Sequence, residues 1–346
     1  MDSVSQIVLG GAVAFAVAGK SSPRKAILWG AVTATMPDLD VLVSYPDAIS
    51  SVTKHRSWSH SWLIQTLIAP VLALLMYRLD KVFTFKQWLL LIWLSLITHS
   101  CLDAQTVYGT QLFWPFMPPP YSGGSVFIID PLYTAPLLIG FIAVLIRPLS
   151  AVSHRLSHAG LILSSAYLLW AFSVQSWILS QVKIELAEKN ISTEQVMVTA
   201  TPFNTLLWRV LVIDGGVYYE GFRSVFDGDS SIKMSQYQRN TKLLEKLKNN
   251  ESLQRLAWFS DGFYSVEQVG RDYVATDLRM GMEPVYFFRY NIAESTDMVI
   301  NVPSSKRVTN ERRTKEGISW IWQRIWSVGS SFGNVTSDNS TTHPKL

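Results

Sequence analysis

Residues 54–77 read KHRSWSHSWLIQTLIAPVLALLMY. The stretch joins a polar segment that holds His55, Arg56 and His60 to an apolar run, 62–77, suited to lipid. Ionisable side chains close to lipid are costly, and those that occur there usually serve a function. The stretch therefore predicts a membrane helix with a functional site at its start.

Apolar blocks recur through the first half of this 346-residue chain, and charged and turn residues become frequent only after about residue 182. The blocks are 5–18, 26–36, 62–77, 87–99, 132–146 and 159–182. A helix needs roughly 17–25 mainly apolar residues to cross the hydrocarbon core, and shorter blocks can span when flanking Trp, Tyr, Lys and Arg reach the interfaces. Buried helices of a soluble protein are the alternative, but they normally carry a polar stripe, which 132–146 almost lacks. We predict an α-helical membrane domain of about five to six helices, some short, over residues 1–183.

The basic residues of this half predict its orientation. They cluster in three connections, at Lys20, Arg24 and Lys25, at Arg78, Lys81 and Lys86, and at Arg147 and Arg155. By the positive-inside rule these connections face the cytoplasm, which places 37–61, 99–130 and everything after 184 on the outer side.

The first apolar block has no basic residue before it and does not match a cleavable signal peptide. The net charge of +4 is mild, so we expect no nucleic-acid partner, and the single Cys101 excludes an internal disulfide.

The second half has the pattern of a small extramembrane α+β domain over 184–303. Stretches rich in β-branched and aromatic residues, separated by turns, predict strands at 210–222, 263–270, 272–281 and 283–292. A helical insert is expected at 240–258. Residues 304–346 combine an amphipathic segment, 312–328, with a tail expected to be disordered. The amphipathic segment can lie on the membrane surface or pack on the β domain.

Four pieces of sequence bring ionisable residues to the predicted outer interface. They are TMPDLD (35–40), HRSWSHS (55–61), THSCLD (98–103) and FIIDP (127–131). His99 and Asp103 are four residues apart and share one helical face. His55 and His60 would diverge by about 140° on a regular helix, so a loop or a helix start is needed for both to converge.

Carboxylates and neutral imidazoles together are typical ligands of zinc, or of manganese where oxygen prevails. The predicted metal ligands are Asp38, Asp40, His55, His60, His99 and Asp103. These exceed the three protein ligands of a one-metal catalytic zinc site, which favours two or more ions. Each residue also has a simpler interpretation: Asp130 before Pro131 can cap a helix, Asp40 can stabilise a turn, His60 can bind backbone, and His99 with Asp103 can be a buried hydrogen-bonded pair.

The motifs PDLD, HRSWSHS, HSCLDAQTVYGTQLFWP and IDPLY, in this order among hydrophobic helices, resemble the bacterial membrane-bound metal-dependent hydrolases of the YdjM-like family. The resemblance covers about residues 1–183. The family pattern His-Arg-Gly-x-Thr-His-Ser has Ser57 and Ser59 here in place of glycine and threonine. The family in turn is distantly similar to the zinc-dependent phospholipase C and P1 nuclease superfamily.

The resemblance implies a multi-pass protein of the bacterial inner membrane that hydrolyses a substrate with metal-activated water. Arg56 would bind an anionic oxygen, and Asp40 or Asp130, whichever is not a ligand, would accept the proton of the water. A site at the interface favours a phosphoester of an amphiphilic or lipid-linked substrate, with 108–127 as a lid or mouth loop. Two other functions stay open: a transporter or channel for ions or protons, and a noncatalytic scaffold in which metal only holds helices together.

Overall fold

The computed structural model of the protein describes residues 1–296, 299–301, 305–308 and 314–327. It divides into two compact units. The helical unit comprises Met1–Ser44 and Lys54–Phe172, and the α+β unit comprises Tyr45–Thr53 and the residues from Ser173 onward. The predicted boundary at 183/184 therefore differs from the structural one, which falls inside a long helix, and the short insertion at 45–53 was not anticipated.

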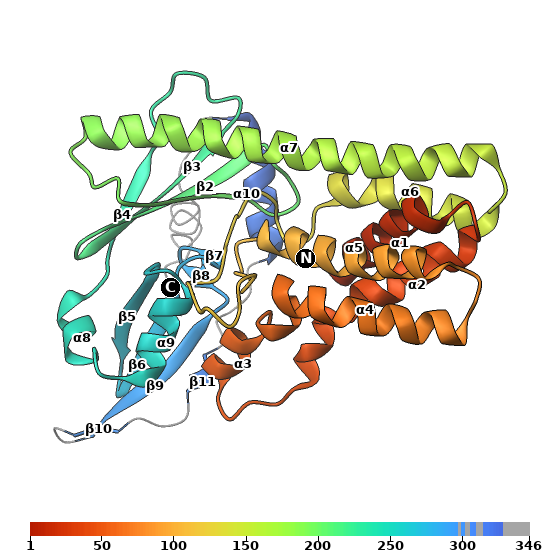
Figure 1. The fold of residues 1–346 in the computed structure, drawn as a ribbon. Helices are drawn as coiled ribbons and strands as arrows, with labels where there is room; N and C mark the ends of the chain where they lie inside the picture. The colour runs from red at the N-terminus through yellow and green to blue at the C-terminus, as the bar shows by residue number, and fades with distance from the viewer. Residues whose placement is uncertain (297–298, 302–304, 309–313, 328–346) are drawn as a thin grey trace, which may run out of the picture. The chain divides into compact units, whose positions relative to one another are not determined.

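The helical unit confirms the fold class predicted from the apolar blocks, and each block forms a helix (Figure 1). The helices are α1 (Ser3–Ala18), α2 (Pro23–Thr35), α4 (Trp62–Leu79), α5 (Phe85–Ala104), α6 (Pro131–Ile146) and the first part of α7 (Ala151–Glu188). Three of them, α4, α5 and α7, are long and apolar enough to cross a membrane. The short 3₁₀ helices η1 (Pro37–Leu42) and η2 (Trp58–His60) interrupt the chain between α2 and α4.

Glycines allow the helices of this unit to approach closely. A Cβ atom added to Gly30 of α2 would lie 2.2 Å from the carbonyl oxygen of Gly10 in α1, and one added to Gly10 would lie 2.3 Å from the Cβ of Ala34. Close backbone contact through small residues is the usual means of helix association in membranes, where apolar burial gives little driving force. Close packing at Gly10, Gly30 and Ala34 therefore holds α1 against α2.

The three basic connections meet at one end of the helical unit. The ammonium of Lys25 donates to Asp80 Oδ2 at 2.7 Å, Gln87 Nε2 donates to Ser21 Oγ at 2.8 Å, and Arg24 Nε donates to the carbonyl oxygen of Leu145 at 2.8 Å. The segments with the candidate ligands follow the other ends of α2 and α5 and precede α4. Basic residues and candidate site therefore occupy opposite ends of the same bundle.

The α+β unit contains the strands and helices that the sequence predicts, and its strands pair antiparallel (Figure 1). One sheet has the order β1-β2-β3-β4, with β1 (Gln195–Ala200), β2 (Leu207–Asp214), β3 (Val217–Ser224) and β4 (Met234–Gln238). The other has the order β10-β9-β6-β5, with β5 (Tyr264–Val269), β6 (Asp272–Asp277), β9 (Arg289–Thr296), β10 (Val299–Asn301), and β11 (Lys306–Arg307) paired to β9. A small ladder joins β7 (Gly281–Met282) to β8 (Val285–Tyr286). The remaining helices are α3 (Ala48–Lys54), α8 (Thr241–Lys246), α9 (Glu251–Phe259) and α10 (Thr314–Trp326).

The predicted strand segment 210–222 is a hairpin rather than a single strand. It turns at Gly215, whose φ of +56° lies in the left-handed region that glycine enters without a Cβ clash. The predicted helical insert at 240–258 is likewise divided into α8 and α9. In both cases the sequence pattern predicts the correct type of element, strand or helix. A single turn then divides each predicted segment into two elements.

Helix α7 extends well beyond the length a bilayer requires. Its 38 residues would span about 57 Å at 1.5 Å per residue, against a hydrocarbon core of about 30 Å. The apolar face formed by Val174, Ile178, Val182 and Leu186 packs on the sheet against residues such as Trp208 and Val210. The last residues of the predicted span 159–182 are thus covered by protein, and the part of α7 up to Phe172 belongs to the helical unit.

Of the two alternatives for segment 312–328, the structure adopts packing on the β domain. Trp320, Ile321 and Ile325 of α10 are buried against Leu207 and Phe222. The guanidinium of Arg324 in the same helix forms a buried ion pair with Asp227 (Nη2–Oδ2 2.7 Å). The tail from residue 328, expected to be disordered, lies outside the described residues.

Candidate metal centre

Local sequence brings the candidate ligands to the ends of helices. Pro37 begins η1 directly after α2, so Asp38 and Asp40 lie on an irregular turn. Ser61 caps α4, which places His60 at the end of η2, immediately before the helix. His99 and Asp103 lie one turn apart near the end of α5.

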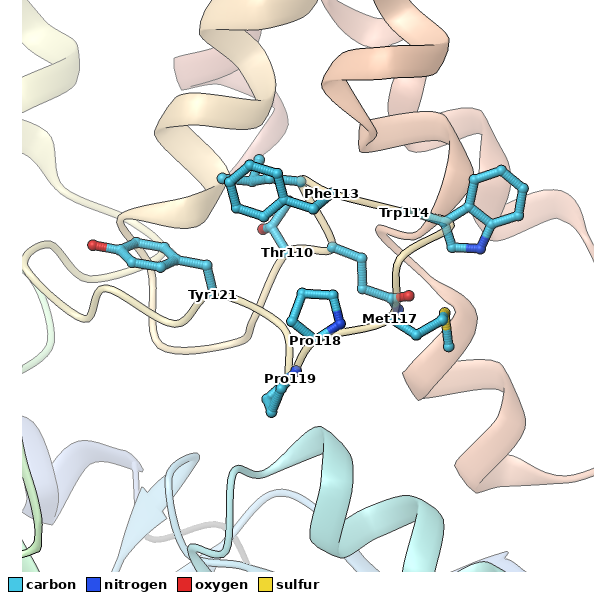
Figure 2. Close-up of a pocket in the computed structure, with 9 residues that line it drawn as sticks. Thr110, Phe113, Trp114, Met117, Pro118, Pro119 and Tyr121 are labelled. Carbon is cyan, nitrogen blue, oxygen red and sulfur yellow. The ribbon is translucent and has the colours of Figure 1, made fainter.

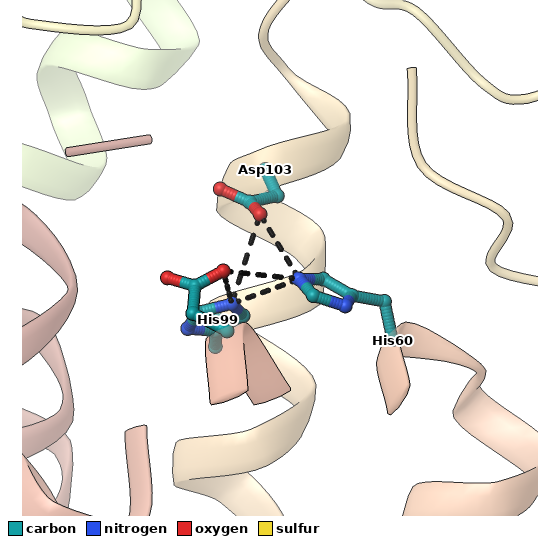
Figure 3. A group of neighbouring side chains, drawn as sticks. His60, His99 and Asp103 are labelled. Carbon is teal, nitrogen blue, oxygen red and sulfur yellow. Dashed lines mark hydrogen bonds and ion pairs between the residues drawn. The ribbon is translucent and has the colours of Figure 1, made fainter. Parts of the chain in front are cut away.

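Four side chains converge at this point, Asp38, His60, His99 and Asp103 (Figure 3). Their ligand atoms all lie within 4.8 Å of one another. The two imidazole Nε2 atoms are 3.1 Å apart, and each is 3.5 Å from Asp38 Oδ1. Asp103 Oδ2 is 3.2 Å from the Nε2 of His60 and 3.6 Å from that of His99. Residues from three separate segments therefore share one small volume.

The four ligand atoms have different access to the surroundings. The side chains of His60, His99 and Asp103 are fully buried, whereas that of Asp38 is 28% exposed. Two neutral imidazoles and two carboxylates, mostly withdrawn from water, would be unfavourable without positive charge. Asp38 marks the side on which the cluster is open.

The tautomer of His60 follows from its neighbours. The Ser59 hydroxyl has a single proton and donates it to Asp40 Oδ2 at 2.6 Å, so at 2.9 Å from His60 Nδ1 it accepts. His60 Nδ1 is then the protonated nitrogen, and Nε2 presents its lone pair to the cluster. An outer partner of this kind, holding a metal-binding histidine by its second nitrogen, is the usual arrangement around protein metal ions.

The bonding of Asp103 also fits a cation. Its Oδ1 accepts from Gln6 Nε2 at 2.9 Å and from the amino group of Met1, whereas its buried Oδ2 has no hydrogen bond among the described residues. The Nε of Arg56 lies 2.9 Å from Oδ2 but without the alignment of a hydrogen bond. The oxygen with no hydrogen bond is the one that faces both histidines. A divalent ion with mixed nitrogen and oxygen ligands, such as zinc or manganese, fits these donors.

The local field of the cluster attracts positive charge. Burial lowers the pKa of the His60 imidazole, but the carboxylates of Asp103 and Asp38 raise it by more, so its pKa lies above the ordinary value. A site whose carboxylates draw a proton onto a buried imidazole would also draw a metal ion, and the two would compete.

Asp40 and His55, both predicted as metal ligands, are not among the four converging residues. His55 Nδ1 lies 2.6 Å from Asp40 Oδ1, while Asp40 Oδ2 accepts from the backbone N–H of Arg56 at 2.9 Å and from Ser59. Burial raises the pKa of the Asp40 carboxyl, but the hydrogen bonds from His55 and Ser59 outweigh burial and lower it. The structure thus brings together four of the six predicted ligands. Both carboxylate oxygens of Asp40 are engaged, by His55 on one side and by Ser59 and the Arg56 backbone on the other.

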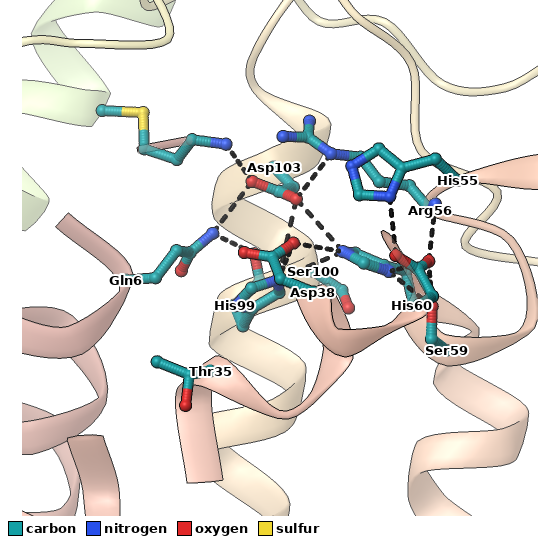
Figure 4. Close-up of polar contacts among 12 residues, drawn as sticks. Gln6, Thr35, Asp38, His55, Arg56, Ser59, His60, His99, Ser100 and Asp103 are labelled. Carbon is teal, nitrogen blue, oxygen red and sulfur yellow. Dashed lines mark hydrogen bonds and ion pairs between the residues drawn. The ribbon is translucent and has the colours of Figure 1, made fainter. Parts of the chain in front are cut away.

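Arg56 lies beside the cluster in a constrained conformation (Figure 4). Its backbone has φ of +58°, which is unfavourable for a residue with a side chain, and its side chain is buried. Nη1 donates to Thr106 Oγ1 at 3.2 Å, and the guanidinium lies 4.9 Å from the centre of the Tyr108 ring. The surrounding structure thus holds a positive group next to Asp103.

Asp130, predicted as a possible catalytic base, lies outside the cluster. Its side chain caps the N-terminus of α6, which was the alternative interpretation of this residue. Its Oδ1 accepts from the backbone N–H groups of Leu132 and Tyr133, and its Oδ2 accepts from the Tyr167 hydroxyl at 2.8 Å. Both oxygens are therefore used in holding the start of α6.

Sequence reasoning missed two supporting residues, Ser59 and Gln6. Ser59 orients His60, and Gln6 binds both Asp103 and the carbonyl oxygen of His99. Gln6 gave a usable signal, since an amide side chain inside an apolar membrane block needs a partner. Ser59 gave none, because a serine next to a histidine is common in loops.

Comparison with known proteins gives the family. The profile of the YdjM inner membrane protein family matches residues 1–178. The chain is also 30% identical over 107 residues to the inner membrane protein YbcI of Escherichia coli (strain K12), a stretch that covers 30% of this chain and 59% of that protein. The chain thus spans about three fifths of the length of this curated relative. No solved structure matches the chain. The matched residues include all four converging side chains and every helix of the helical unit, and the chain belongs to the YdjM inner membrane protein family.

Proposed function

We propose that this protein is a membrane-bound metal-dependent hydrolase that acts on a phosphoester of an amphiphilic substrate. The observation that supports the proposal is the convergence of Asp38, His60, His99 and Asp103 within 4.8 Å, with only Asp38 partly exposed. Four ligand atoms open on one side fit a catalytic centre better than a closed structural one, which would be fully covered.

The proposed chemistry divides between the ion and the chain. A bound divalent ion would supply Lewis acidity to a water molecule and to the phosphoryl oxygen of the substrate. The chain orients the ligands: Ser59 and Asp40 fix the ring of His60, and Gln6 fixes Asp103. The guanidinium of Arg56 provides fixed positive charge for an anionic oxygen of the substrate.

The pair of His55 and Asp40 is the best candidate for moving the proton. His55 is partly exposed (23%) and its Nδ1 is held by Asp40 at 2.6 Å, so its other ring nitrogen is free to face substrate or water. A histidine oriented by a carboxylate is the common form of a general base. The proton-accepting role predicted for Asp40 would thus pass to the imidazole that Asp40 holds.

We further propose that the centre and the α+β unit lie on the outer side of the inner membrane. Support comes from the contacts that gather the connections with Arg24, Lys25 and Lys81 at the end of the helical unit away from the centre. Basic connections of this kind face the cytoplasm.

Metal content of the detergent-purified protein, measured by inductively coupled plasma mass spectrometry, tests the proposal together with hydrolysis of generic phosphodiesters. His60→Ala and His99→Ala should each lose the metal, whereas His158→Ala, an exposed histidine of α7, should keep it. His55→Ala should keep the metal but lower turnover by about 10²–10⁴-fold, the usual contribution of a general base.

Three outcomes would contradict the proposal in different ways. Wild-type protein without zinc or manganese under non-chelating conditions would exclude a metal enzyme. Full occupancy with no turnover of any ester would favour the scaffold. Ion flux through liposomes that is lost in His99→Ala would favour transport.

A further inference from the structure

The loop after α5 encloses a pocket of its own, distinct from the four converging ligands. The pocket has a volume of about 250 Å³ and is lined by two short stretches of this loop, Thr110–Trp114 and Met117–Pro119 with Tyr121. Figure 2 shows these side chains arranged around the folded loop, with Pro118 and Pro119 at its tip. Most of the lining is apolar, and its polar side-chain groups come from Thr110, Gln111, the indole of Trp114 and the hydroxyl of Tyr121.

The pocket wall is rigidly attached to the segment that bears Arg56 and His60. The backbone N–H of Gln111 donates to the carbonyl oxygen of Arg56 at 3.0 Å, and the backbone N–H of Trp62 donates to that of Leu112 at 3.0 Å. The Ser61 hydroxyl donates to the carbonyl oxygen of Trp114 at 2.7 Å. A pair of backbone hydrogen bonds between Thr110 and Tyr121 closes the loop. These bonds fix the pocket wall to the segment that bears two residues of the candidate centre.

The irregular segments around the centre expose several large apolar side chains, whose contact with water is unfavourable. In η1 the carboxylates of Asp38 and Asp40 turn inward, while Leu39, Val41 and Leu42 are 56–76% exposed. Trp58 in η2, and Phe113, Phe116 and Met117 in the loop, are exposed as well. Together these residues form an apolar rim on irregular backbone, which belongs at the membrane interface rather than in the hydrocarbon core.

We propose that the pocket of residues 110–121 binds a hydrocarbon chain of a membrane amphiphile whose polar group reaches the metal centre. The inference rests on the proposed function for the role of the centre, but the chain-binding step depends only on the pocket. Lipid is the occupant because the rim and most of the pocket lining are apolar, and because helices of the same unit are apolar enough to lie in a bilayer. The loop thus sets which chains are accepted, and Arg56 and Asp38 select the polar group.

Photo-crosslinking tests the pocket without requiring catalysis. The full chain is placed in bilayer nanodiscs with phosphatidylethanolamine that carries a diazirine on one acyl chain, and the labelled peptides are mapped by mass spectrometry. We expect labelling of residues 110–121. Met117→Trp, which fills the lip of the pocket, should reduce labelling by about tenfold, since each excluded methylene loses roughly fourfold in affinity. Phe116→Trp, on the same loop but outside the pocket lining, should not.

Separate readouts distinguish failure of this inference from failure of the proposed function. Metal content reports folding of the centre in each variant, and labelling of His99→Ala reports the pocket when ligands are removed. Equal labelling in Met117→Trp and Phe116→Trp, or labelling confined to α4 and α7, would overturn the chain-binding site. Wild-type protein that holds no metal but is still labelled at residues 110–121 would overturn the enzyme but leave the pocket in place.

Discussion

Single side chains divide into those that face the proposed ion and those that orient them. Asp38, His60, His99 and Asp103 face it, while Ser59, Asp40 and Gln6 hold them from behind. The sequence predicted six ligands, because spacing alone does not tell a ligand from the partner of a ligand. It did indicate that His55 and His60 could converge only through a loop. The structure makes that loop η2 and turns only His60 inward.

Replacement of Ser59 by alanine should weaken metal binding. His60 Nδ1 loses the acceptor that fixes its tautomer, and loss of such an outer partner typically lowers metal affinity by about 10–100-fold. Competition with a chromophoric zinc chelator measures the change. Ser59→Thr keeps the hydroxyl and should preserve affinity, as should Ser180→Ala on the exposed side of α7. Unchanged affinity in Ser59→Ala would show that the ring is held by other contacts.

Replacement of Asp130 separates capping from catalysis. Asp130→Ala removes the acceptor for two backbone N–H groups at the start of α6 and should lower stability by about 0.5–2 kcal/mol. Asp130→Asn keeps a capping oxygen and should retain both stability, measured by thermal melting in detergent, and phosphodiester turnover. A stable but inactive Asp130→Asn would instead support the predicted role of Asp130 as a catalytic base.

At the scale of elements, hydropathy located every helix of the helical unit but misplaced the end of one span. An apolar helical face has the same composition whether lipid or a sheet covers it, so the residues of α7 from Val174 to Val182 could not be assigned from the sequence. Most of the longer strands were recognisable because β-branched and aromatic residues alternate or cluster along them, whereas β1 and β4 lie outside the predicted segments. The hairpin at Gly215 and the division of α8 from α9 depended on single turns.

The α1–α2 contact predicts a sharp response to added volume. Gly30→Val would place a side chain against the Gly10 carbonyl, where even a Cβ lies at 2.2 Å, and the helices would have to separate. Overpacking of this kind costs about 1–3 kcal/mol. Thermal melting in one detergent should show the loss for Gly30→Val and little change for Leu28→Val, on the exposed face of α2. Equal melting temperatures would mean that the two helices are not tightly packed.

For the whole molecule, the division of charge between the two ends of the helical unit predicts its orientation. In a Cys101→Ser background, Asp229→Cys in the α+β unit should react with a membrane-impermeant maleimide in intact cells. Leu149→Cys, an 87% exposed residue in the α6–α7 connection, should react only after the cells are opened. The reverse pattern would invert the topology and place the centre at the cytoplasmic face.

The alternation in η1 links the assembly of the centre to the lipid around it. Leu39 and Val41 are exposed on the same turn that carries Asp38 and Asp40 inward, so one six-residue segment offers apolar side chains to a surrounding bilayer and a carboxylate to the ligand cluster. A change in membrane thickness or acyl packing that displaces these apolar anchors would also displace a carboxylate. We therefore expect the metal affinity of the site to vary with the lipid composition of the host membrane, because the surrounding lipid influences the position of one ligand.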